Sequence, residues 1–261
     1  MYYGILLTLR LLPLKLPDWL EDWLSSLADQ FVLNFVKDDR YLYILKGLWT
    51  TIRVTFFATI LGILLGVICA IIRSTYDKCV TDMRKGVGKF ILNILNQIVN
   101  LYLTVIRGTP VVVQLMIAYF VIFASSNNKV LVAILAFGIN SGAYVAEIIR
   151  SGIMSIDPGQ FEAGRSLGFN YVQTMAYIII PQAFKNVLPA LANEFIVLLK
   201  ETSVSGYIGL EDMTKGGDII RSRTYSAFMP LLAVAAIYLI IVVMFSKLVS
   251  LLERRLRNSE R

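Results

Sequence analysis

The chain has 261 residues, of which 57 % are hydrophobic and 16 % are charged, against about 25 % charged residues in soluble domains. It has no histidine, which removes the commonest metal ligand and proton carrier and weakens any metal or histidine-based catalytic site. Cys69 lies in an apolar run and Cys79 in a basic loop, so no disulfide framework is expected. Apolar runs close to the ~20 residues that cross a bilayer predict an all-α polytopic membrane protein.

Residues 1–46 are predicted to form an N-terminal segment of their own, extracytoplasmic or interfacial. Residues 1–16 are apolar but interrupted by charges and a proline, and no small-residue cleavage site follows, so a cleaved signal peptide is poorly supported. Beyond them, one helical face is apolar and carries Trp19, Leu20, Trp23, Leu24, Leu27 and Phe31. This pattern predicts an amphipathic helix that lies on the membrane surface or on the protein's own outer surface.

Five later segments are predicted to span the membrane. They are residues 48–72, 109–124, 130–149, 187–199 and 228–252. A further apolar segment, residues 90–106, has a polar stripe down one helical face. The stripe consists of Asn93, Asn96, Gln97 and Asn100. This segment fits either an interfacial helix or a span whose polar face points inward.

Basic residues indicate how the spans are threaded, because they collect in cytoplasmic loops. Residues 73–89 and the tail, residues 253–261, are both basic, so both are expected in the cytoplasm. With five spans the N-terminus is outside, and 13 of the 25 Lys and Arg residues are inside. A further crossing at 90–106 would put the basic loop outside, so an interfacial or elbow helix is expected there. The net charge of +7 therefore indicates orientation, with no nucleic-acid partner.

The loop between the third and fourth spans, residues 150–186, holds the most specific motif. It reads Glu162-Ala163-Gly164, three residues, Gly168, nine residues, Ile178, two further isoleucines and Pro181. Asp157 and Pro158 predict a helix start, and Gly168 predicts the left-handed turn that ends this helix. A second helix is expected to run from about Tyr171 and to stop before Pro181. Two short helices joined by a tight turn would form a rigid cytoplasmic knob.

This spacing resembles the signature loop of ABC importer permeases, which reads Glu-Ala-Ala, three residues, Gly, nine residues, Ile-x-Leu-Pro. Gly164 replaces the third alanine and is expected to loosen its helix by up to ~1 kcal/mol, and Ile180 replaces the leucine. The resemblance implies that the knob docks into a separate ATPase subunit, which binds ATP and Mg. The coupling residues it implies are Glu162, Ala163, Gly164, Gly168, Ile178 and Pro181.

Weaker motifs resemble those of polar amino-acid permeases of the histidine, glutamine and arginine type. They are Arg107-Gly108-Thr109-Pro110 with Gln114-Leu115, Ala143–Glu147 with Arg150, Asn193–Ile196, and Lys200–Ser203. The resemblance implies a five-span type I importer permease domain at residues 47–252, in the inner membrane of a bacterium. It also implies an extracytoplasmic binding protein and a second permease, either another copy or a similar chain. The amino acid carried is left open.

Polar residues within the spans are candidates for a substrate pathway, because ionisable groups in a membrane protein are commonly functional. Glu194 is expected either to accept the ammonium group of an amino acid or to be a structural partner of Asn140, a tyrosine or a nearby base. Four further residues either line the same cavity or join helices: Gln114, Asn140, Ser141 and Tyr144. Arg107 and Glu147 are expected to form ion pairs or interfacial anchors near the cytoplasmic ends.

No catalytic residues, metal site or cofactor of its own are predicted for the chain. Residues 86–90 come nearest to a phosphate loop. The pattern would also need a glycine in place of Met83 and a Ser or Thr in place of Phe90. Two alternative functions remain open. An ion-coupled secondary transporter would need inverted repeats or charged relays. A membrane scaffold without a transport role would leave Glu194 and the loop motif unexplained.

Overall fold

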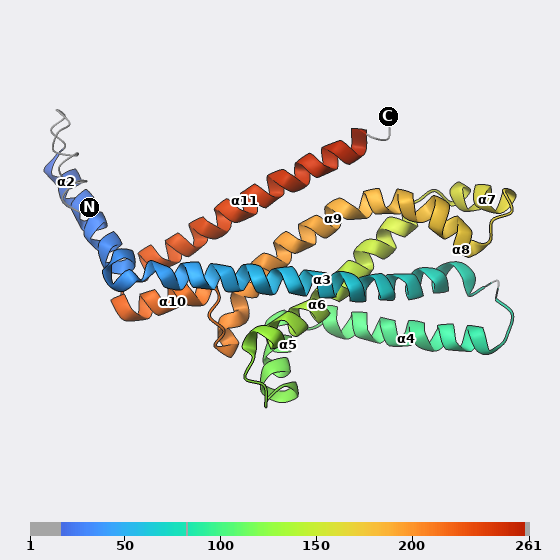
Figure 1. Ribbon diagram of the computed structural model, residues 1–261, viewed down its shortest axis with the longest axis horizontal. Coiled ribbons are helices and arrows are strands. Elements are labelled where there is room, and N and C mark those ends of the chain that lie inside the picture. Colours follow the sequence, from blue (N-terminus) through green and yellow to red (C-terminus); the bar gives the residue numbers. More distant parts are fainter. Residues whose placement is uncertain (1–16, 82, 259–261) are drawn as a thin grey trace.

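The computed structural model describes residues 17–81 and 83–258, and its long helices form a tilted bundle (Figure 1). Residues 1–16 and 259–261 lie outside the described residues, and with them the expectation about a signal peptide and the end of the basic tail. The α-helices are α2 (Asp18–Phe31), α3 (Tyr41–Cys79), α4 (Val87–Arg107), α5 (Val111–Ile117), α6 (Lys129–Met154), α7 (Pro158–Ser166), α8 (Tyr171–Thr174), α9 (Ile180–Glu201), α10 (Met213–Thr224) and α11 (Phe228–Asn258).

Within the described residues, five helices are long and apolar enough to cross a membrane, which matches the expected number. They are Tyr41–Cys79, Val87–Arg107, Lys129–Met154, Tyr171–Ile208 and Phe228–Leu256. The segments that form these five helices differ from the five segments predicted from the sequence. The segment expected to be interfacial, residues 90–106, belongs to a candidate span, whereas the expected span 109–124 forms only a short helical stretch, Val111–Ile122. The break lies at Gly108–Pro110, because Pro110 has no amide hydrogen to continue α4 and instead begins α5.

Helices α4 and α5 together return the chain along α6, so the basic loop after α3 and the loop after α6 lie at the same end of the bundle. Arg150 near the end of α6 lies 3.3 Å from Asp77 near the end of α3, which places both helix ends together. At the opposite end, Lys129 donates a hydrogen bond to the carbonyl of Gly209 at 3.0 Å. The chain from Val87 to Ile122 lies between these two ends and turns back into α6 (Figure 1).

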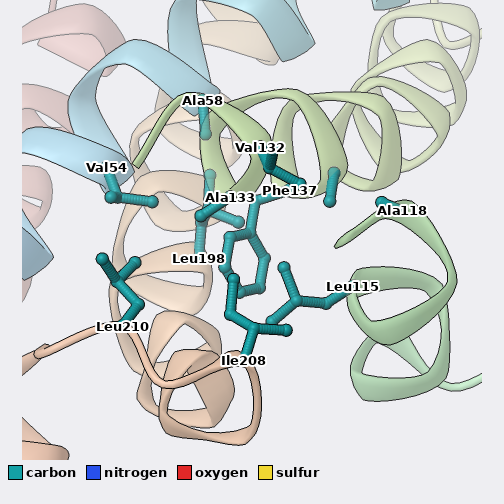
Figure 2. Packing of buried hydrophobic residues seen from close by; sticks show 11 residues of the cluster. Val54, Ala58, Leu115, Ala118, Val132, Ala133, Phe137, Leu198, Ile208 and Leu210 are labelled. Carbon is teal, nitrogen blue, oxygen red and sulfur yellow. The ribbon is translucent and has the colours of Figure 1, made fainter. Parts of the chain in front are cut away.

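Helix α6 is the central helix of the bundle, with most of its apolar span buried. It packs closely on α3, because glycines on both helices leave room for the neighbouring backbone. A Cβ atom on Gly66 would lie 2.4 Å from Val145, and one on Gly138 would lie 2.6 Å from Leu61. A core around Phe137 then joins α6 to α3, α5, α9 and the segment after α9 (Figure 2).

Helix α2 stands apart from the bundle (Figure 1). None of its residues is buried, and Trp19 and Trp23 are 70 % and 56 % exposed. The chain joins the bundle only after α2, where Phe35 packs with residues of α3, α10 and α11. The amphipathic helix is therefore confirmed. It does not pack on the outer surface of the chain itself, which was one of the two expected surfaces.

Candidate functional site

The knob expected from the loop motif is present at one end of the bundle (Figure 1). Asp157 caps α7 by accepting a hydrogen bond from the backbone amide of Gly159 at 2.7 Å. Gly168 ends the helix in the left-handed region with φ of 79°. Asn170 and Gln173 then exchange side-chain-to-backbone hydrogen bonds that start α8 at Tyr171, as expected.

The expected stop before Pro181 is wrong. The chain continues from α8 through a π-helical turn, Met175–Ile179, directly into α9. Pro181 lies just after this π-helical turn, at the start of α9, so a proline at this position does not end the helix. The second half of the knob is thus continuous with the fourth candidate span, Tyr171–Ile208.

The glycine that departs from the family motif lies where the two halves of the knob touch. Gly164 is buried, and a Cβ atom there would lie 2.7 Å from Cγ2 of Thr174 and 3.2 Å from Cδ1 of Ile178. The space that an alanine methyl would need is therefore filled by side chains of α8 and the turn that follows.

The outer surface of the knob carries exposed apolar side chains, which the sequence reasoning did not single out. Glu162 and Ala163 are exposed, and so are Leu167, Val172 and Tyr177, each about 70 %. Apolar side chains in an otherwise polar loop were the available signal. Another contact that the sequence did not indicate joins the knob to α3, where the ammonium of Lys78 lies 4.6 Å from the centre of the Phe161 ring.

The polar residues of the expected substrate pathway form two separate groups. Glu194 is buried, with 8 % of its surface exposed, and its Oε1 accepts a hydrogen bond from Ser141 at 2.9 Å. Asn140 instead donates to Oε1 of Gln114 at 2.9 Å. Nε2 of Gln114 donates to the carbonyl of Ile106 at 2.7 Å, so it fastens α5 across the break after α4. Gln114 and Asn140 therefore join helices, whereas Glu194 has Ser141 as its partner.

The expected ion pairs of Arg107 and Glu147 are present as part of a longer chain of charges. Glu147 lies 2.8 Å from Arg150 and 3.7 Å from Arg107, and Arg150 continues to Asp77. Arg73 of α3 donates to the side chain of Asn100 in α4. These contacts tie α3, α4 and α6 together toward the end of the bundle that carries the knob.

Two cavities meet at this chain of charges. One, of about 460 Å³, is lined by Glu194, Tyr144, Arg107 and Glu147 among others, but by neither Gln114 nor Asn140. The other, of about 420 Å³, shares Arg107, Tyr144 and Glu147 and also contacts Arg73. The first cavity is thus lined by two anionic side chains, one cationic side chain and an aromatic ring.

A family model described as "Binding-protein-dependent transport system inner membrane component" matches residues 87–258. The chain belongs to this family. It is also 34 % identical to the putative glutamine transport system permease protein GlnP of Rickettsia typhi, over 83 % of this chain and 94 % of that protein. The arginine transport system permease protein ArtQ of Bacillus subtilis is 34 % identical over 84 % of this chain and 94 % of its own length.

Solved structures agree with this membership. A crystal structure of an amino acid ABC transporter with histidines has 43 % sequence identity and a TM-score of 0.72, covering 82 % of this chain and 94 % of that one. The inward-facing MetNI methionine ABC transporter, at 19 % identity and a TM-score of 0.67 over 86 % of this chain and all of that one, shares the fold. The binding-protein-dependent permease is thus the membrane-spanning subunit of an ABC importer, and neither a secondary transporter nor a scaffold.

Proposed function

We propose that this permease carries a polar amino acid into a bacterial cell across the inner membrane. An extracytoplasmic binding protein delivers the amino acid, and a separate ATPase subunit, which holds ATP and Mg, supplies the energy. The permease pairs with a second copy or a similar permease, and it has no catalytic, metal-binding or nucleic-acid-binding role of its own. Relatives that are named for glutamine and arginine transport, at 34 % identity over most of the chain, support this substrate class.

The orientation we propose places the N-terminus outside and the C-terminus in the cytoplasm. Its support is that the basic loop after α3 and the knob after α6 lie at the same end of the bundle, where the Arg150–Asp77 ion pair joins the ends of α6 and α3. Basic loops remain on the cytoplasmic side of membrane proteins. An ATPase that works from the cytoplasm then meets the knob, and the exposed side chains of Leu167, Val172 and Tyr177 supply apolar area for it to cover.

The observation that carries the substrate pathway is the buried carboxylate of Glu194, whose hydrogen-bond donor from the chain is the neutral hydroxyl of Ser141. A neutral donor leaves the carboxylate able to bind a cation, because the second oxygen keeps its acceptor capacity. Glu194 also borders a cavity of about 460 Å³, a volume within the range of small-molecule sites. We assign Glu194 to the ammonium group of the transported amino acid.

Glu194→Gln tests this assignment because it preserves the shape of the side chain and its acceptor for Ser141 while removing the charge. In the complex purified with its ATPase and reconstituted in liposomes, the substitution should lower the rate of amino-acid uptake at least about tenfold, which corresponds to one lost charge-assisted contact. Co-purification of the ATPase should not change. Uptake at the unsubstituted rate would reject the role of Glu194.

A further inference from the structure

Helix α2 has an apolar face that the described part of the chain leaves unburied. The side chains of this face recur every three or four positions and are Trp19, Leu20, Trp23, Leu24, Leu27 and Phe31. The opposite, acidic face carries Asp18, Glu21, Asp22, Ser25 and Asp29. Such a helix is stabilised where its apolar face is covered and its acidic face stays in water.

The base of α2 is fastened to the bundle, so its position is fixed by the fold. Asn34 lies in the π-helical turn Val32–Val36 that follows α2, and its side chain is fully buried. Its Oδ1 accepts a hydrogen bond from the hydroxyl of Thr224 at 2.8 Å, and its Nδ2 donates to the hydroxyl of Ser226 at 3.4 Å. The base of α2 therefore lies beside the connection between α10 and α11, at the end of the bundle opposite the knob (Figure 1).

The start of α11 gives the depth of this attachment in the membrane. Residues 228–246 contain no charged residue. At 1.5 Å per residue this run is about 28 Å long, close to the ~30 Å of the hydrocarbon core. Phe228 therefore lies near one edge of the hydrocarbon, and Ser226 holds the base of α2 at that edge. Tryptophan side chains collect at this boundary between lipid and water.

An aromatic pair shows which way the apolar face of α2 is turned. The rings of Phe31 and Phe35 lie 5.1 Å apart. Phe35 belongs to one buried cluster with Ile44 of α3 and Val234 of α11, and Val234 lies further into the apolar run than Phe228. At its base, the apolar face is thus turned toward the hydrocarbon, while α2 runs away from the bundle across the direction of α3 (Figure 1).

We propose that α2 binds the phospholipid surface at the end of the bundle opposite the knob, with Trp19 and Trp23 among the lipids and its acidic face in water. The contact is apolar, because α2 has no Lys or Arg to attract anionic headgroups. Through Asn34, α2 holds the connection between α10 and α11 at the membrane surface. In the orientation proposed above this surface is the outer leaflet, but the contact itself requires neither substrate nor ATP.

The test is quenching of tryptophan fluorescence in the permease–ATPase complex, reconstituted in phosphatidylcholine vesicles. Subtracting the signal of the Trp19→Phe/Trp23→Phe complex isolates α2, whatever other tryptophans the complex contains. Lipids brominated near the headgroup should quench this difference signal at least about twofold more than lipids brominated near the bilayer centre. Acrylamide in the water should quench it less than it quenches free tryptophan.

Two matched variants test whether the apolar face makes the contact. Leu24→Glu puts a charge on the apolar face and should reduce quenching by the brominated lipids at least about twofold. Ser25→Glu adds the same charge to the acidic face and should leave the quenching unchanged. Co-purification of the ATPase shows that each variant is assembled. Equal losses in both variants would contradict the proposal.

The unsubstituted complex also decides between the lipid and other partners. Strong acrylamide quenching without quenching by brominated lipids would place α2 in water and overturn the proposal. If added binding protein then suppressed the acrylamide quenching, the apolar face would belong to that partner instead. Protection from both quenchers would assign the face to a protein contact within the complex, such as a second permease, and would also overturn the proposal. None of these outcomes depends on which substrate is carried.

Discussion

Gly164 shows how one residue can set the shape of the knob. A methyl group at this position would lie 2.7 Å from Cγ2 and 2.8 Å from Oγ1 of Thr174, both well inside normal contact distance. We expect Gly164→Ala to separate α7 from α8 and to destabilise the knob by about 1–3 kcal/mol, the usual cost of overpacking. The measurement is the yield of ATPase that co-purifies with the permease, which should fall.

A second substitution distinguishes this overpacking from a general effect of alanine. Thr174→Ala removes the two closest atoms that the new methyl group would meet, although it also removes the hydrogen bond from Thr174 to the carbonyl of Asn170. The double variant Gly164→Ala/Thr174→Ala should therefore bind more ATPase than Gly164→Ala alone. Additive losses would show that the contact between residues 164 and 174 does not matter.

Asp212 gives the chain a pH-dependent contribution to its stability, outside the candidate spans. Its carboxylate is buried and caps α10 by accepting from the amides of Lys215 and Thr214 at 3.0 and 3.1 Å. Burial raises its pKa from 3.8 to about 6, although the hydrogen bonds oppose this shift. The folded protein then holds this proton more tightly than the unfolded chain does, so Asp212 favours folding below about pH 4 and loses that contribution as pH rises through 6.

We expect the free energy of unfolding to fall by on the order of 2–3 kcal/mol between pH 4 and pH 7 through Asp212 alone. Asp212→Asn keeps an oxygen acceptor for the cap but cannot ionise, so its melting temperature in detergent should lack this part of the pH dependence. If the melting temperatures of the unsubstituted chain and the variant changed with pH in the same way across this range, Asp212 would not titrate there.

At the scale of secondary-structure elements, a cation–π pair joins α7 to the end of α3. The ring of Phe161 faces Lys78 on α3, and it also packs against the cluster of Ile153, Ile156, Ile179 and Ala183. A displacement of α7 is therefore expected to act on α3 as well as on α9. We expect Phe161→Leu, which keeps the apolar packing but loses the ring, to reduce coupling to α3.

The expected result is a fall of about twofold to fivefold in the ratio of substrate-stimulated to basal ATP hydrolysis, in line with ~0.5–1 kcal/mol for an exposed cation–π pair. Phe161→Tyr retains a ring and should behave like the unsubstituted complex. An unchanged ratio in Phe161→Leu, with the ATPase still attached, would show that the pair has no part in coupling.

Local signals in the sequence were sufficient for the knob, whereas the limits of two helices depended on packing. Capping residues and Gly168 act through the nearest turn of backbone, so they placed α7 and the start of α8 correctly. Pro181 does not end the helix, because the π-helical turn before it leads into α9. No residue pattern predicted that turn. The break at Gly108–Pro110 was visible in the sequence, but not that α4 and α5 together form one return along α6.

For the candidate substrate residues too, the sequence indicated some features, whereas packing determined the others. The position of Glu194 within an apolar span marked it as a candidate, and the structure gives it a buried place beside Ser141. Which polar groups face each other depends on how the helices are rotated about their axes, and hydropathy does not contain that information. For this reason Asn140 was a candidate partner of Glu194 in the sequence but bonds Gln114 in the folded chain.

At the scale of the whole molecule, one long helical segment connects the knob with Glu194. The knob lies at one end of the segment Tyr171–Ile208, and Glu194 lies further along it, at the cavity shared with Arg107. The knob and Glu194 therefore lie on one helical segment, which contains Pro189 between them. We propose that this segment couples ATP hydrolysis in a partner subunit to passage of an amino acid through this one.

The most direct test of this account is uptake of labelled L-glutamine and L-arginine into liposomes that contain the permease, its ATPase and its binding protein. We predict accumulation of one or both amino acids only when the binding protein is outside, ATP is inside and all three components are present. Uptake that persists without the ATPase, or that follows an imposed ion gradient instead of ATP, would contradict the account.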